Sequence, residues 1–234
     1  MKSIVKDKGI NLTKQAQSLL LEFCDLLAGT SIFGGPIKVL SPQILALAVL
    51  DSITKALRHG GWMGDCLSKR VLKKLIQILE PLQTATPAKR GSIESLYVEL
   101  PISILESHSI GGDDSRKVEL SREDLKTLAT IVPVILHLEG DGLKSAQLLT
   151  LRLVINLTNH RPATCDIFSK TRLISTLVNI TKINFEALSG FLEEEERLIQ
   201  LDMLVLSLAL MINFAEMSEA GRLAFMEGFT TLDF

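Results

Sequence analysis

The chain has 234 residues, of which 47% are hydrophobic, 22% charged and 5% aromatic. This composition predicts one soluble globular domain spanning residues 1–234 with a large aliphatic core, and it excludes an extensively disordered chain. The net charge of −2 is unevenly spread along the chain. Residues 1–90 carry +7, from 13 Lys and Arg and 6 Asp and Glu, and residues 91–234 carry −9, from 12 Lys and Arg and 21 Asp and Glu. Such asymmetry is typical of opposed surfaces for differently charged partners or of ordinary solvated helix faces.

Apolar residues recur at helical spacing through most of the chain, while the alternation typical of strands is nearly absent. The sequence therefore predicts an all-α protein. In chain order, the expected helices cover residues 14–28, 42–58, 67–79, 92–106, 122–139, 142–158, 170–183 and 195–215, and a last one begins near residue 219. Ser41-Pro42 places proline at a first helical position, and Ser121 before Glu123 and Asp124 has the form of an N-cap followed by first-turn acids.

Three segments rich in turn-forming residues are expected to be loops, at 28–36, 80–92 and 107–121. None of them is long enough to separate two domains. The longest apolar run, Met203–Ile212, is far shorter than the roughly 20 residues that span a bilayer. We interpret this run as part of a buried core helix.

The sequence contains an internal repeat at an offset of 57 residues, which aligns 148–168 with 205–225. Seven aligned pairs are identical, where ordinary composition would give about one or two. The unit is a nearly all-round apolar helix, a polar turn and an amphipathic helix, which predicts a right-handed helical-repeat solenoid of the HEAT or armadillo type. Because such units have about 40 to 47 residues, we expect 184–197 to be an insertion with an exposed acidic edge. The identical pairs are Leu149 and Leu206, Leu151 and Leu208, Leu153 and Leu210, Ile155 and Ile212, Asn156 and Asn213, Ala163 and Ala220, and Phe168 and Phe225.

Asn156 and Asn213 occupy equivalent places in the last turns of their helices. A side-chain amide there can pair with carbonyls that the helix end leaves open, so the first interpretation is a structural latch. In armadillo proteins the equivalent Asn often binds the backbone of an extended peptide, and this functional interpretation stays open. Phe168 and Phe225 are taken as further structural positions of the repeat.

The C-terminal third resembles the end of the WAPL (Wings apart-like) domain. The segment "LRLVINLTNH" at 151–160 is similar to a Leu-Thr-Asn helix of that family, and "EEERLIQLDMLVLSLALMINFAEMSEAGR" at 194–222 is similar to its Glu-x-x-Arg segment followed by an aspartate that opens a Leu-rich helix. The likeness is good from about 144 to 222 and suggestive from 44 to 80, which contains "LAVLDSIT". The matching residues are Asn156, Leu157, Thr158, Asn159, Glu194, Arg197, Asp202, Ile212, Asn213, Glu216 and Ser218.

The resemblance implies a nuclear, chromatin-associated regulator of sister chromatid cohesion and chromosome segregation that is not an enzyme. Members of the family bind cohesin and its accessory HEAT-repeat subunits and promote release of cohesin from chromatin, while the ATP chemistry belongs to cohesin. The chain lacks the long N-terminal tail and the Phe-Gly-Phe motifs of animal members, so a fungal-like short form or a fragment is expected. The alternative is a generic armadillo-like adapter that binds an extended peptide. Against it, only two units carry the Asn, and Trp62 is not part of a Trp ladder.

The helix expected at 67–79 is the best candidate for a functional surface. Its apolar residues share one face, which leaves its cations outward. Three interpretations of these cations stay open: ordinary solubility, contact with an acidic protein surface, and binding of DNA phosphates without sequence-specific readout. The apolar residues are Val71, Leu72, Leu75, Ile76 and Leu79, and the cations are Lys69, Arg70, Lys73 and Lys74. The polar turn residues Asn159, His160 and Arg161 are further candidates for protein contact.

No arrangement of residues predicts catalysis, a metal site, a cofactor or a small-molecule substrate. The His and Cys residues lack the spacing of metal ligands, and "GTSIFGGPIK" lacks the Gly-Lys-Ser/Thr ending of a phosphate loop. A nucleophile pair of His160 and Cys165 is disfavoured because Cys165 falls at the start of an ordinary helix of the repeat.

The three cysteines, Cys24, Cys66 and Cys165, are scattered and odd in number, which predicts a reducing compartment and no disulfide framework. Residues 1–12 also lack the apolar run of a signal peptide. The Asn-X-Thr sequences are therefore interpreted as chance matches rather than glycosylation sites. They begin at Asn11, Asn156 and Asn179.

Overall fold

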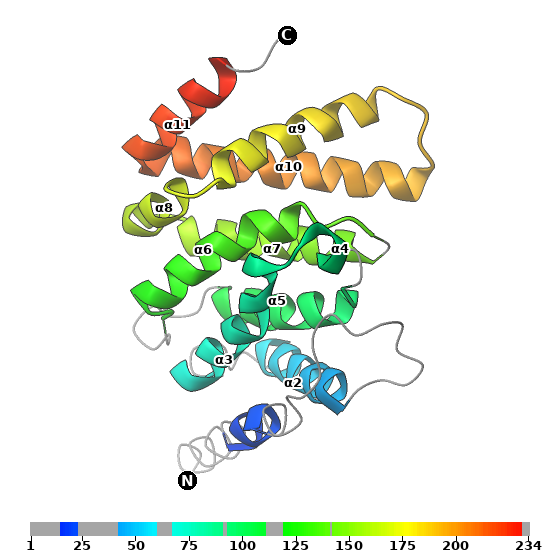
Figure 1. The fold of residues 1–234 in the computed structure, drawn as a ribbon, viewed down its shortest axis with the longest axis vertical. Helices are drawn as coiled ribbons and strands as arrows, with labels where there is room; N and C mark the ends of the chain where they lie inside the picture. Colours follow the sequence, from blue (N-terminus) through cyan, green and yellow to red (C-terminus); the bar gives the residue numbers. More distant parts are fainter. Residues whose placement is uncertain are drawn as a thin grey trace. The chain divides into compact units, whose positions relative to one another are not determined.

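The structure is a computed structural model that describes residues 15–22, 42–59, 67–90, 93–110, 119–140 and 142–230. Within these ranges the chain forms helices and no strand, which confirms the all-α prediction (Figure 1). The expectations for the loop at 28–36 and for Asn11, Cys24, Cys66 and Trp62 lie outside the described residues. The chain divides into two compact units, Met1–Asp124 and Leu125–Phe234.

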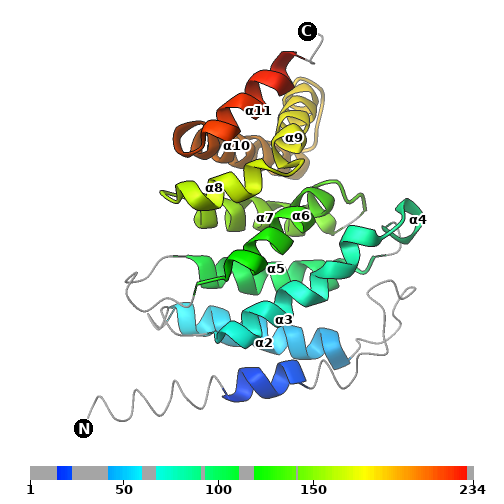
Figure 2. The ribbon, with the colours of Figure 1, turned by 60° about the vertical axis from the view of Figure 1, so that its left-hand side comes forward.

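The described part of the first unit is built around α5, which packs against α2 and α3 (Figures 1 and 2). A helical segment at 15–22 precedes these helices. The elements are α2 (Pro42–His59), α3 (Lys69–Leu79), η2 (Glu80–Thr84), α4 (Pro87–Arg90) and α5 (Ser95–Ser109). Their core is aliphatic and includes Ile44, Leu47, Leu50, Leu72, Leu75, Ile76 and Ile102.

Two side-chain hydrogen bonds join α2 to α5 inside this core. The Tyr97 hydroxyl donates to Gln43 Oε1 at 3.0 Å, and the Ser103 hydroxyl donates to Asp51 Oδ1 at 2.8 Å. The second Asp51 oxygen accepts from Lys55 Nζ at 2.7 Å. Buried polar groups are stable only when they are paired, so these bonds favour one alignment of α2 along α5.

The segment at 80–92 was expected to be a loop, and this expectation is wrong in part. A 3-10 turn directly continues α3, and the short helix α4 follows it. Pro81 lies at the start of η2 and Pro87 at the start of α4. Proline needs no amide hydrogen in a first helical turn, and its fixed φ angle suits that position. The prolines that indicated a loop therefore begin helical turns.

The second unit contains α6 (Arg122–Leu136), which begins at the boundary, and five further helices. They are α7 (Leu143–Thr158), α8 (Pro162–Ser169), α9 (Leu173–Leu188), α10 (Glu194–Met217) and α11 (Glu219–Thr230). The expected N-cap of α6 is present, since Ser121 Oγ accepts the Asp124 amide hydrogen at 3.1 Å. The expected helix ranges left out α8, although the repeat placed Cys165 at the start of a helix. The structure has that helix, and it begins at Pro162.

The segment at 184–197 was expected to be an insertion, and the structure corrects this. Residues up to Leu188 complete α9 and residues from Glu194 begin α10, so that only 189–193 join the two helices. The two helices lie side by side and antiparallel (Figures 1 and 2). The surplus residues therefore lengthen a helical hairpin. The acidic residues Glu193–Glu196 are exposed, as expected.

The run Met203–Ile212 was interpreted as part of a buried core helix, and this is only half right. One side of α10 is buried against the unit, at Met203, Ser207, Leu210 and Phe214, while apolar residues on the other side are exposed. Of the helices that the structure describes, α10 alone is long and apolar enough to cross a membrane by length and composition. In this structure it packs mainly against α9 and α7.

The internal repeat corresponds to a repeated order of helices. An offset of 57 residues carries α7 and α8 onto α10 and α11. The equivalent pairs Leu153 and Leu210, and Phe168 and Phe225, are all buried. These two pairs therefore hold equivalent places in the core of the second unit, whereas Leu208 and Ile212, the equivalents of Leu151 and Ile155, are exposed.

Candidate functional site

The basic helix α3 presents the face that its sequence predicts. Ser68 caps the helix by accepting the Val71 amide hydrogen at 3.4 Å. The buried residues are the five expected ones, Val71, Leu72, Leu75, Ile76 and Leu79. Of the four cations, Lys69, Arg70 and Lys73 are exposed and Lys74 is half-buried. The apolar face thus orients the cations toward the surface.

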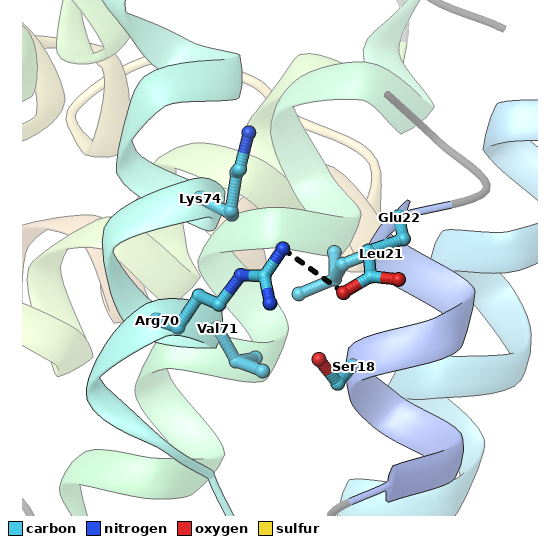
Figure 3. A pocket seen from close by; sticks show the side chains of 6 residues that line it. All are labelled: Ser18, Leu21, Glu22, Arg70, Val71 and Lys74. Carbon is cyan, nitrogen blue, oxygen red and sulfur yellow. Dashed lines mark ion pairs between the residues drawn. The ribbon is translucent and has the colours of Figure 1, made fainter. Parts of the chain in front are cut away.

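Arg70 is paired with an acid from the helical segment at 15–22 (Figure 3). Its Nη2 lies 2.9 Å from Glu22 Oε1. Around this ion pair is a shallow hollow of about 10 Å³, lined by Ser18, Leu21, Glu22, Arg70, Val71 and Lys74. A hollow of this size is below the roughly 300–1,000 Å³ of typical small-molecule sites. Because Glu22 offsets the charge of Arg70, we consider Lys69 and Lys73 the most effective cations for an acidic partner.

A second group of predicted residues forms a polar junction around the end of α7. The Thr158 hydroxyl donates to Val154 O at 2.7 Å and accepts from Asn213 Nδ2 at 3.2 Å. The Thr158 carbonyl accepts the Cys165 thiol at 3.4 Å. Three helices, α7, α8 and α10, therefore share hydrogen bonds at one residue. The Asn213 amide is therefore bonded within the protein, as the structural latch interpretation requires.

Cys165 is fully buried within this junction. Burial and, to a smaller extent, the neighbouring Asp166 carboxylate raise the pKa of its thiol to about 11. A thiol must lose its proton to act as a nucleophile. The surroundings of Cys165 therefore oppose the chemistry of a catalytic cysteine.

The three turn residues predicted for protein contact follow α7 directly. Asn159 and His160 are exposed, and Arg161 is half-buried. His160 adopts a left-handed backbone conformation with φ of 53°, which is uncommon for a residue other than glycine. Asn156, which is equivalent to Asn213 in the repeat, is half-buried. No direct bond between Asn156 and Asn213 is found in the described part of the chain.

Asp202 lies within α10 rather than at its start, because the helix begins at Glu194. Its carboxylate lies 3.9 Å from Arg152 Nη2 on α7, and both side chains are about half exposed. Exposed ion pairs of this kind contribute little to stability. The pair places Asp202 on the flank of α10 that faces α7.

The buried Ser218 caps the start of α11, and in the sequence it stood out only as a residue that matches the WAPL pattern. Ser218 Oγ accepts the Gly221 amide hydrogen at 3.0 Å and donates to Asp166 Oδ1 at 2.7 Å. It also lies 3.3 Å from Ser169 Oγ. The cap of α11 is therefore bonded to α8. Among the described residues, no group of three or more His, Cys, Asp or Glu side chains that could hold a metal ion is found.

The sequence profile described as "Wings apart-like protein regulation of heterochromatin" matches residues 1–221. The chain belongs to the WAPL family. No curated protein and no solved structure matches the chain significantly. Membership confirms the resemblance seen in the sequence and extends it over the first unit. The WAPL family is one of regulators rather than enzymes, and its association with chromatin regulation implies a nuclear location.

Proposed function

We propose that this WAPL-family chain binds cohesin and its accessory HEAT-repeat subunits and promotes the release of cohesin from chromatin. The observation that supports this best is the family match over residues 1–221. The family is one of regulators rather than enzymes. Shape and surface charge would therefore provide the activity, and the ATP chemistry would remain with cohesin.

We further propose that the whole chain, 1–234, is a right-handed helical-repeat solenoid. Two successive pairs of a long and a short helix, related by the 57-residue repeat, support this reading. In such proteins each unit buries its faces against its neighbours, which leaves extended surfaces for partners.

The first contact that we assign is between α3 and an acidic surface of cohesin or its accessory subunits. Lys69 and Lys73 are exposed, and no ion pair of either is found among the described residues. Charges at the rim of an interface act mainly by speeding association and by excluding wrong partners. The polar turn at 159–161 is a second candidate contact.

Binding of purified cohesin with its accessory subunit tests both the partner and the surface. Reversing two charges with Lys69→Glu and Lys73→Glu should weaken binding about tenfold, because attraction becomes repulsion. Both residues lie outside the buried face, so helicity and thermal stability should be unchanged. The matched control is Lys144→Glu with Lys182→Glu, which makes the same charge change at exposed positions of the second unit.

Equal losses in both double variants would mean that net charge, and not α3, governs binding. If the wild-type chain fails to bind any cohesin subunit, the proposed function is wrong. DNA is the other anionic partner of a basic helix, and its binding would weaken steeply with salt. Because no set of residues suited to reading bases accompanies the cations of α3, we expect no sequence-specific DNA binding.

The armadillo-like peptide adapter is the weaker candidate. Its binding residues would be the repeated asparagines, and the amide of Asn213 is bonded to Thr158. An extended peptide would have to displace that bond. Loss of peptide binding in Asn213→Leu with unchanged stability would favour the adapter.

A further inference from the structure

An apolar stripe runs along the exposed side of α10. We call it the α10 stripe, and it consists of Leu198, Leu201, Val205, Leu208 and Ile212. Each of these side chains is between 43% and 58% exposed. Single exposed apolar residues are common on soluble proteins, whereas a continuous apolar surface indicates a binding site. The five residues are continuous along the helix.

The spacing of the stripe is the spacing of a helix-packing seam. Successive members are 3, 4, 3 and 4 residues apart, which is the repeat by which one helix packs along another in a coiled coil. From Leu198 to Ile212 the stripe is about 21 Å long, at 1.5 Å of rise per residue. Two heptads of a second helix would cover it.

The contacts of α10 show that its own unit does not cover the stripe. On one flank, Asn213 and Asp202 reach α7. On the other flank, the Thr181 hydroxyl of α9 donates to Met211 Sδ at 3.6 Å. The buried residues, among them Met203 and Phe214, lie between these flanks. At 100° per residue the stripe lies opposite the buried side.

The charges that α10 itself carries are almost all negative. The exposed charged residues of α10 are Glu194, Glu195, Glu196, Asp202 and Glu216 against Arg197. Glu194 precedes the first stripe residue by four positions, and Glu216 follows the last one by four. Residues four apart lie on the same side of a helix. A carboxylate therefore stands in line with the stripe at each end.

We propose that the α10 stripe binds a basic amphipathic helix of a partner protein. The partner would place Leu, Ile or Val at 3-4 spacing on the stripe and Lys or Arg beside the carboxylates of α10. A second copy of α10 would bring two acidic helices together, and an anionic membrane would repel the same carboxylates. Complementary charge selects the partner and apolar burial holds it. The proposal goes beyond cohesin binding and does not depend on the partner being a cohesin subunit.

The test measures binding of synthetic helices to the full chain by fluorescence anisotropy. The first probe is a labelled three-heptad peptide with Leu at the two core positions and Lys at the flanking positions. The second has the same Leu residues with Glu in place of Lys, and the third keeps Lys but has Ser in place of Leu. We expect the first probe to bind at least about tenfold more tightly than either of the others.

Two matched double variants assign the binding to the stripe. Val205→Ser with Leu208→Ser should weaken binding of the first probe about tenfold or more, because the centre of the seam is lost. Leu45→Ser with Val49→Ser removes the same residue types from exposed positions of α2 and should leave binding unchanged. Circular dichroism of both variants should match the wild type, since the altered side chains are exposed.

Several outcomes would overturn the proposal. Equal binding of the Lys and Glu probes would show that charge does not select the partner. Equal binding of the first probe to both double variants would show that the stripe is not the binding site. A dimer seen by sedimentation and lost only in Val205→Ser with Leu208→Ser would identify a second copy as the occupant. Binding to uncharged lipid vesicles with the same dependence would identify a bilayer surface. Absence of binding by every probe would also count against it.

Discussion

Thr158 is the residue at which three helices of the second unit meet. Its hydroxyl bonds to Val154 O and to Asn213 Nδ2, and its carbonyl accepts the Cys165 thiol. Thr158 itself is buried. Buried hydrogen-bonding groups are costly when they lose a partner. We therefore interpret the Asn-Leu-Thr-Asn segment as a structural junction first and as a contact surface second.

A double-mutant cycle measures the bond that crosses from α10 to α7. Asn213→Ala and Thr158→Val should each destabilise the chain, because each removes one partner of a half-buried bond. Together they should cost about 1 kcal/mol less than the sum of the two single effects, since the second change finds the bond already lost. Urea unfolding at pH 7 measures these free energies. Additive effects would show that the bond contributes nothing.

The raised pKa of Cys165 makes a prediction about its reactivity. With a pKa of about 11, only roughly one thiol in a thousand is ionised at pH 8. In Cys24→Ser with Cys66→Ser, where Cys165 is the remaining cysteine, iodoacetamide should react at pH 8 at least about 100-fold more slowly with folded chain than with chain unfolded in urea. Similar rates in the two states would contradict a buried, neutral thiol.

The same shift has a consequence for stability in alkali. The folded chain holds the Cys165 proton more tightly than the unfolded chain does, so this stabilisation is fully present below pH 9. This stabilisation is lost as the pH rises from the ordinary thiol pKa of 9.0 toward about 11. Between pH 8.5 and 10.5 the free energy of unfolding should therefore fall less in Cys165→Ala than in the wild type, as measured by urea unfolding at both pH values. An unchanged slope would contradict the shift.

At the scale of elements, the turn from α10 into α11 is a close approach of two backbones. A Cβ added to Gly221 would lie 2.8 Å from Phe214 O and 3.1 Å from Phe214 Cβ. A real Cβ is essentially never this close to backbone. The Ser218 cap, which bonds to the Gly221 amide, fixes the same turn. Glycine at 221 is therefore a requirement of packing.

Gly221→Ala should destabilise the second unit by about 1–3 kcal/mol, because α11 must shift away from α10 to admit the methyl group. Gly190→Ala is the matched control, since a Cβ there would meet Ala187 O at an ordinary 3.4 Å. We expect the control to change stability by less than about 0.5 kcal/mol. Thermal and urea unfolding compare the two variants. Equal effects would mean that the close approach is not a constraint.

At the scale of the whole molecule, the division at residue 124 predicts that the second unit folds independently. It has its own core, which includes Leu151, Phe168, Leu177, Leu210 and Phe214. Units with separate cores can fold alone. A fragment of residues 119–234, which keeps the Ser121 cap, should be helical and unfold cooperatively in urea. A fragment that binds hydrophobic dyes and unfolds without a transition would show that its core needs the first unit.

Elements with a strong helical period could be predicted from sequence even where a local signal argued against them. The expected helices at 92–106 and 122–139 pass through Pro101 and Pro133, and α5 and α6 do contain these prolines. Apolar burial along the whole helix outweighs the one bond that proline removes. By contrast, α8 and η2 are too short to show a period and begin with the residues that usually mark turns.

The sequence by itself determined which residues of α3 are buried, the N-cap at Ser121, the repeat of two helix pairs, and the family. Each of these depends on spacing along one helix or on a pattern of residue types, which a sequence records directly. Only the tertiary structure decided that Asn213 bonds to Thr158, that Glu22 pairs with Arg70, and that half of the apolar α10 is exposed. These features depend on which elements lie next to one another, because a helix that is apolar on all sides does not specify which side its neighbours cover.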